Sequence, residues 1–425
     1  MKKIILLFFV CLFAIPVCFY CFKSDNTGKI GFFESAENNR NNENGNKKEN
    51  DEKNGMKSSD ELRGVWLSYY EIAEICKGKT EEEYRKSVEK IVSSLCENSY
   101  NTVFFQVRAF SDALYRSALF PSSKYVVKKE GDTLSFDPLE IFIEYAKKND
   151  ISTHAWVNPF RVSFSDDVKK ISDNNPAKLF LKDKNNKNAL IICEKGIYYN
   201  PANSEVQKLI LSGIKELFEN YGIDGIQFDD YFYPPCKITA DSDAYKEYCS
   251  KGGTLSLSEF RRETVSEFVS SVYRTVKSYG EEKIFGISPS AKIDYNENEI
   301  FADVILWCRS SGYIDYVMPQ IYFGFENETM KFSDVAQEWS GLSKNENVKL
   351  YCGLASYKCG KEDKNAGSGK NEWLENSDII SKQYLFIEKS ADFSGFCLFS
   401  YSFSFGENMN EISKKEIKNL NDMIK

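Results

Sequence analysis

Two adjacent aspartates, Asp229 and Asp230, end a short apolar run in the stretch YGIDGIQFDDYFYPP, residues 221 to 235. Crowded like charges raise the pKa of one carboxyl, which can then act as a general acid while its neighbour stays ionised. The plainer alternative is a solvated pair that caps a loop. We assign the acid role to Asp230, and Asp229 becomes an orienting carboxylate or a nucleophile.

The residue types expected near this pair fit a sugar. Aromatic side chains offer flat apolar faces with a polar edge, and amide or guanidinium groups offer donors for hydroxyls. Each of these residues alone is more often explained by packing, but together at strand ends they favour a glycan cleft. The candidate substrate-binding residues are Trp66, Gln106, Arg108, Asp112, Trp156, Asn158, Tyr199, Tyr231, Tyr233, Gln320 and Tyr322.

The elements that must position these residues are eight strand-like runs separated by amphipathic, helix-like stretches. Eight such units predict one (β/α)₈ TIM barrel, an α/β fold. An open, doubly wound sheet is the rival, but it would leave two sheet edges and the first turn is not glycine-rich. The runs are 63–69, 102–108, 152–160, 225–232, 283–290, 313–323, 349–357 and 395–403.

Alternation along the strands predicts where their polar residues face. In the second run Phe105 and Val107 alternate with Gln106 and Arg108. A parallel strand covered by helices is apolar on its helix side, so the polar set faces the barrel axis. We therefore expect Gln106, Arg108, Asn158, Asp229, Gln320 and Tyr322 to meet at the C-terminal mouth, where barrel sites are built.

Two long connections follow the third and fourth strands. Residues 161–202 predict an inserted hairpin and residues 234–256 a second excursion. Both would overhang the same mouth and wall a cleft.

Several other functions lack the residues they need. His154 is the single histidine, which hardly supplies a metal site or a catalytic triad, and we expect it to be buried. Residues 365–373 lack the first glycine of a phosphate loop, since position 364 is Lys364. The net charge of -8 gives no basic field for nucleic acid. We expect no metal and no cofactor.

The N-terminus carries a targeting signal. Lys2 and Lys3 precede an uncharged run from Ile4 to Phe22, which predicts a signal peptide or signal anchor over residues 1–22. Residues 23–60 are rich in Asn, Lys and Glu and predict a disordered tether, with the barrel over 61–425. The barrel is then extracellular, either anchored at the cell surface or secreted, and meets the membrane only through this segment.

Nine of the twelve cysteines follow the targeting segment, without C-x-x-C spacing. We expect most of them to be buried thiols, and a Cys236–Cys249 bridge stays open.

Seven ordered blocks resemble the bacterial glycosyl hydrolase-like family 10, a group of secreted or surface-tethered TIM-barrel proteins. They are ELRGVWLSY, NTVFFQVRAFSDALY, FDPLEIFIEYAKKNDISTHAWVNPFRV, YYNPANSEV, DGIQFDDYFYP, FGISPS and IDYVMPQIYF, between Glu61 and Phe323. The resemblance implies a glycoside hydrolase that acts on cell-wall glycan such as peptidoglycan strands. The family's aspartates match Asp229 and Asp230, and its third-strand asparagine matches Asn158.

The fifth strand, FGISPSAKID, lacks the glutamate that many barrel glycosidases carry there. Adjacent aspartates suit a substrate-assisted reaction, in which the sugar's acetamido group attacks, better than two carboxylates about 5 Å apart on separate strands. Asp112, followed by Asp294, is the rival acid. Two other functions stay open: a non-catalytic glycan-binding barrel and, less well supported, a metal-dependent deacetylase.

Overall fold

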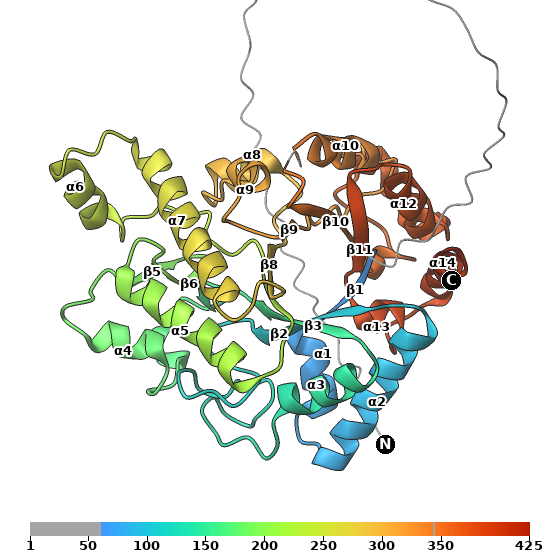
Figure 1. Cartoon of the computed structure of the whole chain (residues 1–425), viewed down its shortest axis with the longest axis horizontal. Coiled ribbons are helices and arrows are strands. Elements are labelled where there is room, and N and C mark those ends of the chain that lie inside the picture. The colour runs from blue at the N-terminus through green and yellow to red at the C-terminus, as the bar shows by residue number, and fades with distance from the viewer. Residues whose placement is uncertain (1–60, 343–344) are drawn as a thin grey trace, which may run out of the picture. The chain divides into compact units, whose positions relative to one another are not determined.

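A computed structural model gives the structure of residues 61–342 and 345–425. Eight parallel strands close into a barrel in the order β1-β11-β10-β9-β8-β7-β3-β2, and helices surround it (Figure 1). The predicted TIM barrel is confirmed. Its strands are β1 (Leu62–Leu67), β2 (Thr102–Arg108), β3 (Ser152–Val157), β7 (Gly225–Phe228), β8 (Ile284–Ile287), β9 (Tyr316–Val317), β10 (Lys349–Leu354) and β11 (Phe393–Leu398).

The predicted targeting segment, 1–22, and tether, 23–60, lie outside the described residues. Within the part of the chain that the structure describes, none of the helices combines the length and the apolarity needed to cross a membrane.

Amphipathic helices cover the barrel. In the helix over residues 81–97, Thr80 and Glu83 form a capping box at the start, and apolar residues from Tyr84 to Leu95 recur on the buried face. The covering helices are α1 (Tyr69–Cys76), α2 (Glu81–Glu97), α3 (Pro138–Lys148), α5 (Ser204–Asn220), α7 (Leu257–Lys277), α9 (Val304–Arg309), α10 (Phe332–Leu342), α12 (Ile379–Glu388) and α14 (Glu411–Ile424). Short helices in the loops are α8 (Ile293–Asn298), α11 (Glu372–Glu375) and α13 (Tyr401–Ser404).

Alternation along the strands separates two cores. Ala155 and Val157 of β3 belong to the large core between barrel and helices. Trp156 belongs to a smaller core inside the barrel, with Trp66, Phe104, Tyr316, Met318 and Cys397. The period of two therefore sorts side chains between the helix layer and the barrel axis, as the sequence predicts.

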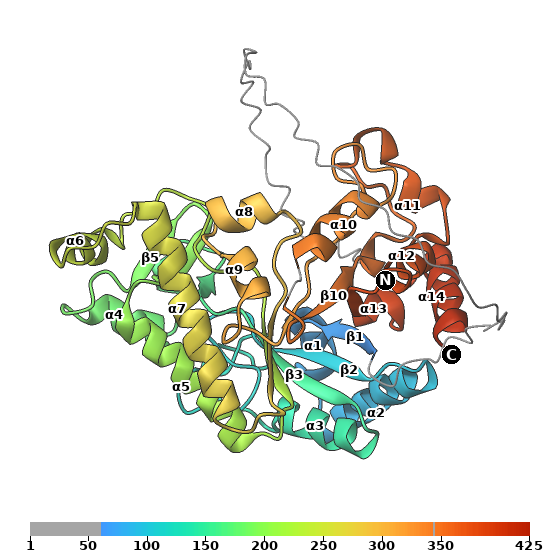
Figure 2. The same ribbon diagram turned by 45° about the horizontal axis from the view of Figure 1, so that its top comes forward.

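The two long connections both leave the C-terminal ends of their strands. The first contains α4 (Pro176–Lys182) and an antiparallel sheet in the order β4-β6-β5, with β4 (Arg161–Ser163), β5 (Leu190–Cys193) and β6 (Gly196–Tyr199). The predicted hairpin is thus β5–β6, with β4 added to it. The second contains α6 (Ser242–Ser250) and contacts the first, because Asn200 Nδ2 donates to the Ala240 carbonyl at 3.1 Å. Figure 2 shows α4, β5 and α6 gathered on one side of the barrel.

A buried carboxylate fastens the loops after the first and last barrel strands. Glu71 Oε2 accepts hydrogen bonds from the backbone N–H and the hydroxyl of Ser68, both at 2.7 Å. Its Oε1 accepts from the Ser400 hydroxyl at 2.7 Å and the Ser402 N–H at 2.6 Å. Four donors satisfy one buried side chain, and this closes the seam between β1 and β11 at the C-terminal end of the barrel.

Candidate active site

The acid pair lies directly after β7, at the C-terminal mouth. Asp229 is 3% exposed, and its Oδ2 accepts from Trp156 Nε1 at 3.2 Å. Its Oδ1 accepts from the Tyr231 N–H at 3.3 Å. Both hydrogen bonds are long, so this buried carboxylate is only weakly supplied with donors.

The two carboxyls hold protons more tightly than free aspartates do. Burial and then the charge of Asp230 raise the pKa of Asp229 well above its usual value, against the opposing charge of Arg161. Burial also raises the pKa of Asp230, although its own backbone N–H, Arg161 and a hydrogen bond with Gln320 favour the ionised form. Such a pair holds a proton to higher pH than free aspartates do, which suits general acid catalysis.

Two amides lie beside the pair at the ends of β2 and β3. Gln106 Nε2 donates to Asn158 Oδ1 at 3.0 Å, and Gln106 Oε1 accepts from the Tyr69 N–H at 3.0 Å. The β3–β7 register pairs Val157 with Phe228. Asn158 and Asp229 each come next in the chain, so they are neighbours at the ends of these two strands. Asn158 Nδ2 is buried and has no hydrogen-bond partner within residues 61–342 and 345–425, which leaves a donor near Asp229.

Trp66 and Trp156 form the floor of the mouth and are not open stacking surfaces. Trp66 is 2% exposed and donates from Nε1 to Gln227 Oε1 at 2.6 Å inside the barrel. Trp156 is also buried, and its indole N–H supports Asp229. Deeper still, His154 is buried beside Tyr316, and burial lowers its pKa to about 4, so it is neutral at pH 7.

Gln320 and Tyr322 reach the mouth on the loop after β9. Gln320 Nε2 donates to the Ser288 carbonyl at 3.0 Å, and its side chain also bonds to Asp230. Four tyrosines lie around Asp230. Burial raises the pKa of each of them, and the negative charge of Asp230 raises it further. They are Tyr198, Tyr231, Tyr295 and Tyr322.

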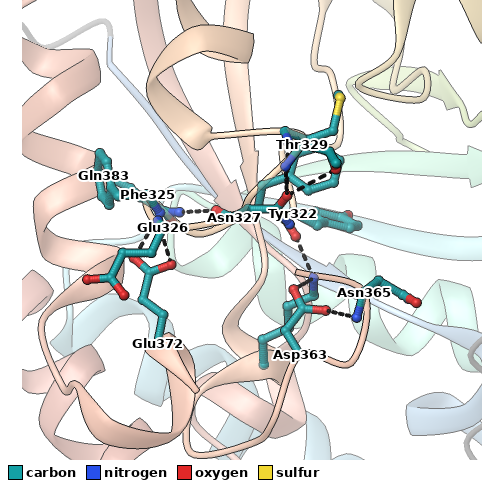
Figure 3. A network of polar contacts seen from close by, with 12 residues as sticks. Tyr322, Phe325, Glu326, Asn327, Thr329, Asp363, Asn365, Glu372 and Gln383 are labelled. Atoms are coloured by element: carbon teal, nitrogen blue, oxygen red, sulfur yellow. Dashed lines mark hydrogen bonds and ion pairs between the residues drawn. The ribbon is translucent and has the colours of Figure 1, made fainter. Parts of the chain in front are cut away.

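A network of polar contacts holds the loop after β9 in place (Figure 3). Lys358 Nζ donates to the Tyr322 carbonyl and to Asp363, both at 2.6 Å. Glu372 accepts from the N–H groups of Phe325 and Glu326 at 2.8 and 2.9 Å. The carbonyl and N–H groups of the loop are thereby held by side chains from the neighbouring segment over residues 358–372, which fixes the position of Tyr322.

Arg108 does not face the mouth, contrary to the prediction. The β2–β3 register shifts between Gln106 and Arg108, and this irregularity pairs Arg108 with the outward-facing Val157. Its guanidinium carbon lies 4.1 Å from the centroid of the Phe120 ring. A Cβ built on Gly213 of α5 would lie 2.1 Å from Arg108 Nη1. A bulge therefore turns the side chain to the helix layer.

Tyr199 and Tyr233 also lie away from the pair. The Tyr199 hydroxyl hydrogen-bonds with Ser111 in the core beneath the inserted sheet. The Tyr233 ring packs against Phe301, at 5.5 Å between centroids. Tyr198, the neighbour of Tyr199 on β6, faces Asp230 instead, because successive side chains on a strand point to opposite faces. Near Tyr233 it is Tyr231, two residues earlier in the loop after β7, that lies near Asp230.

The two rival acids differ in setting. Asp112 is buried, and burial raises its pKa to about 7, with a hydrogen bond to Ser123 opposing the shift. Its Oδ1 has no hydrogen-bond partner among the described residues. Asp294 is exposed on α8 and accepts from Asn298 Nδ2 at 2.7 Å.

Arg161, like Tyr198 and Tyr295, is a site residue that the alternation along the strands does not predict. Its Nε donates to the Ala109 carbonyl at 3.0 Å, and its guanidinium carbon lies 3.8 Å from the centroid of the Tyr231 ring. Burial opposes its charge, but the nearby Tyr231 and Asp229 hold its pKa above the usual value. Arg161, and not Arg108, places a guanidinium group beside the acid pair. Its signal was its place in NPFR, just after the third strand.

The nine cysteines of the described residues are free thiols, and five of them are buried: Cys76, Cys308, Cys352, Cys359 and Cys397. Cys236 hydrogen-bonds with Cys193, whereas Cys249 hydrogen-bonds with Tyr245. The structure therefore does not bring Cys236 to the partner considered from the sequence.

A closed (β/α)₈ barrel with a carboxylate pair at its C-terminal mouth is compatible with a glycoside hydrolase. The family model described as Glycosyl hydrolase-like 10 matches residues 61–369, and the chain belongs to this family. The resemblance seen in the sequence is confirmed, and the match extends beyond Phe323.

Two relatives of this chain are named glycosyl hydrolases. "Glycosyl hydrolase YngK" of Bacillus subtilis is 30% identical over 363 residues, which cover 79% of this chain and 68% of the relative. "Glycosyl hydrolase DigH" of Escherichia coli K12 is 28% identical over 379 residues, which cover 81% of this chain and 84% of the relative.

Solved structures with the same fold are more distant in sequence. The PgaB (BpsB) glycoside hydrolase domain from Bordetella bronchiseptica has a TM-score of 0.58 at 11% identity, covering 84% of this chain and 98% of that domain. The β-amylase catalytic domain from Paenibacillus polymyxa has a TM-score of 0.56 at 10% identity, covering 86% and 99%. At these identities the likeness supports the barrel fold alone.

Proposed function

We propose that the chain is a glycoside hydrolase that cleaves acetamido-sugar glycan of the bacterial cell wall, such as peptidoglycan strands. The observation that carries the proposal is the crowded pair Asp229 and Asp230, whose pKa values are raised at the barrel mouth. Membership of a glycosyl hydrolase-like family supports it. In keeping with the predicted targeting segment, we place the reaction outside the cytoplasmic membrane.

The accessibility of the two carboxyls divides their roles. Asp229 is the more buried, and Asp230 is half-buried beside Tyr231 and Tyr322. Asp230 is thus better placed to reach the oxygen of a leaving sugar. Asp229 would accept the N–H of the substrate's acetamido group. This hydrogen bond favours the ionised form of Asp229 and leaves the shared proton on Asp230.

The reaction then proceeds in two steps. Asp230 gives its proton to the glycosidic oxygen while the acetamido carbonyl oxygen attacks the anomeric carbon, so one C–O bond breaks and one forms. Ionised Asp230 next takes a proton from water, which opens the cyclic intermediate and restores the acetamido group. The anomeric configuration is retained.

The test is incubation of the purified full chain with glycan strands freed of stem peptides, followed by measurement of new reducing ends. Wild-type protein should release them, and the Asp230→Asn and Asp229→Asn variants should not. Strands that bind without being cleaved would instead support the non-catalytic glycan-binding barrel. New amines without new reducing ends would indicate deacetylation.

A further inference from the structure

A group of aromatic rings lies next to the acid pair and is not used by the chemistry described above. Tyr70 is 54% exposed and Phe164 is 39% exposed, and both belong to the exposed large apolar side chains of the described residues. They belong to one cluster that we call the aromatic platform, formed by Tyr69, Tyr70, Phe110, Tyr125 and Phe164. These residues come from the segments that follow β1, β2 and β4, at the C-terminal end of the barrel.

The rings of the platform contact one another in an unbroken row. Phe164 lies 4.9 Å from Phe110, Phe110 lies 6.1 Å from Tyr125, and Tyr125 lies 5.7 Å from Tyr70, all between ring centroids. Tyr69 supports the row from below, at 4.0 Å from Tyr70 and 5.4 Å from Phe110. Three segments distant in sequence thus build one surface.

Arg161 joins the platform to the acid pair. Its guanidinium carbon lies 4.7 Å from the centroid of Phe110, 4.6 Å from Phe164 and 3.8 Å from Tyr231. The N–H of Tyr231 donates to Asp229. One end of the row therefore contacts Arg161, whose charge acts on Asp229.

This composition suits a sugar chain better than a protein partner. Pyranose rings present C–H faces that pack on aromatic rings, and the hydroxyls of Tyr70 and Tyr125 can exchange hydrogen bonds with sugar hydroxyls. The two exposed rings, Tyr70 and Phe164, lie at opposite ends of the row, with the buried Phe110 between them. Arg161 links the Phe164 end to the candidate site, as a subsite for a neighbouring sugar requires. An exposed apolar patch at such a place indicates binding.

We propose that the aromatic platform binds sugar units beyond the cleaved bond, so that the chain acts within long glycan strands and binds short oligosaccharides weakly. This inference rests on the proposed function for its substrate class. The platform holds the strand equally in the ground and transition states, and its loss raises KM with little change in kcat.

Tyr70→Ala and Phe164→Ala test the platform, with Tyr70→Phe keeping the ring. Met423→Ala is the matched control, because Met423 is 40% exposed, as Phe164 is to within one percentage point, but lies at the other end of the barrel. It belongs to α14, whose Ile424 accepts a hydrogen bond from Arg63 near the start of β1. The substrates are stem-free glycan strands and a chromogenic aryl glycoside of one acetamido sugar. Each alanine variant should raise KM for strands about fivefold to tenfold and leave the aryl glycoside kinetics unchanged. Tyr70→Phe and Met423→Ala should keep the wild-type KM for strands.

Unchanged KM for strands in both alanine variants would overturn the platform, and so would equal losses on strands and on the aryl glycoside. If the wild-type chain cleaves neither substrate, the proposed function fails. Co-sedimentation of each variant with insoluble strands then tests whether the platform binds glycan. Weaker sedimentation of the alanine variants would then support it, whereas sedimentation equal to that of Met423→Ala would overturn it.

Discussion

Two carboxylate sites at the same end of the barrel differ in how well they are supplied with donors. Glu71 accepts four hydrogen bonds of 2.6 to 2.7 Å from three serines and holds two loops together. Asp229 accepts two, of 3.2 and 3.3 Å, and lies against a second carboxyl. The satisfied carboxylate fixes the scaffold. Asp229 keeps hydrogen-bonding capacity for a substrate, and burial favours the protonated form of both members of the pair.

The difference has an energetic meaning. Breaking the contacts of Glu71 removes charge-assisted hydrogen bonds that stabilise the fold. The pair instead destabilises the fold at neutral pH, because burial and mutual repulsion oppose its ionisation. Removing the charge of Glu71 should therefore lower the stability of the fold, whereas removing a charge of the acid pair should raise it at neutral pH.

The largest expected effect follows removal of the pair. Asp230→Asn and Asp229→Asn should lower glycan cleavage by about 10³-fold or more, since each removes a group that acts on the substrate. Asp294→Asn, on the exposed rival, should keep full activity. Reducing-end assays measure this outcome, and an Asp229→Asn protein with wild-type activity would remove Asp229 from the mechanism.

The same two variants should be more stable than wild type at pH 8. The folded pKa values are raised, so the folded pair binds more protons than the unfolded chain between the unfolded pKa and the folded one. Stability falls as pH rises through that window, and asparagine removes this loss. Melting temperatures at pH 8 and pH 4 should show a gain that shrinks at the lower pH.

Glu71→Gln should have the opposite effect on stability. The amide places an NH₂ group against donors from Ser68, Ser400 or Ser402, and the free energy of unfolding should fall by about 3 kcal/mol or more. Glu74→Gln, an exposed change in the same helix, should stay within about 0.5 kcal/mol. Urea denaturation compares the two variants. Equal stability of both would contradict the claim that the hydrogen bonds of Glu71 stabilise the fold.

Asp112 tests whether a weakly satisfied carboxyl outside the pair behaves as the pair does. Its folded pKa of about 7 lies above the unfolded value of 3.8, so its contribution to stability falls as pH rises from about 4 to about 7. Asp112→Asn should gain about 2 to 4 kcal/mol at pH 8 and little at pH 4. Asp166→Asn, at an exposed position, is the control for calorimetry at both pH values.

The smallest effect is expected from the charge of Arg161. Arg161→Met removes a charge that favours the ionised pair, so the pKa values of Asp229 and Asp230 rise further. Both limbs of the pH–activity profile should move upward by about half a unit to one unit, and Arg161→Lys should largely restore them. Limbs that stay in place in Arg161→Met would separate Arg161 from the titration of the pair.

The sequence predicts the barrel well, because a period of two on eight strands is a repeated physical constraint. Gln106, Asn158 and Asp229 follow that period to the mouth. Arg108 escapes it because a register shift of one residue reverses its side, and nothing in TVFFQVR marks the shift. The period is a reliable guide only where the ladder is regular.

The loop residues were harder to predict. Tyr199 and Tyr198 are both tyrosines on one short strand, and only the packing of the inserted sheet decides which of them faces Asp230. Arg161 follows the third strand, beyond the range of the alternation argument. The aromatic platform joins segments far apart in sequence, so only the folded chain reveals it.

The most direct test of the proposed chemistry is a structure of the full chain bound to a thiazoline analogue of an acetamido sugar, which mimics the cyclic intermediate. We predict that the sugar ring lies at the barrel mouth, with the thiazoline nitrogen hydrogen-bonded to Asp229 and the anomeric carbon facing Asp230. An analogue bound away from both aspartates, or none bound at saturating concentration, would contradict substrate-assisted cleavage by this pair.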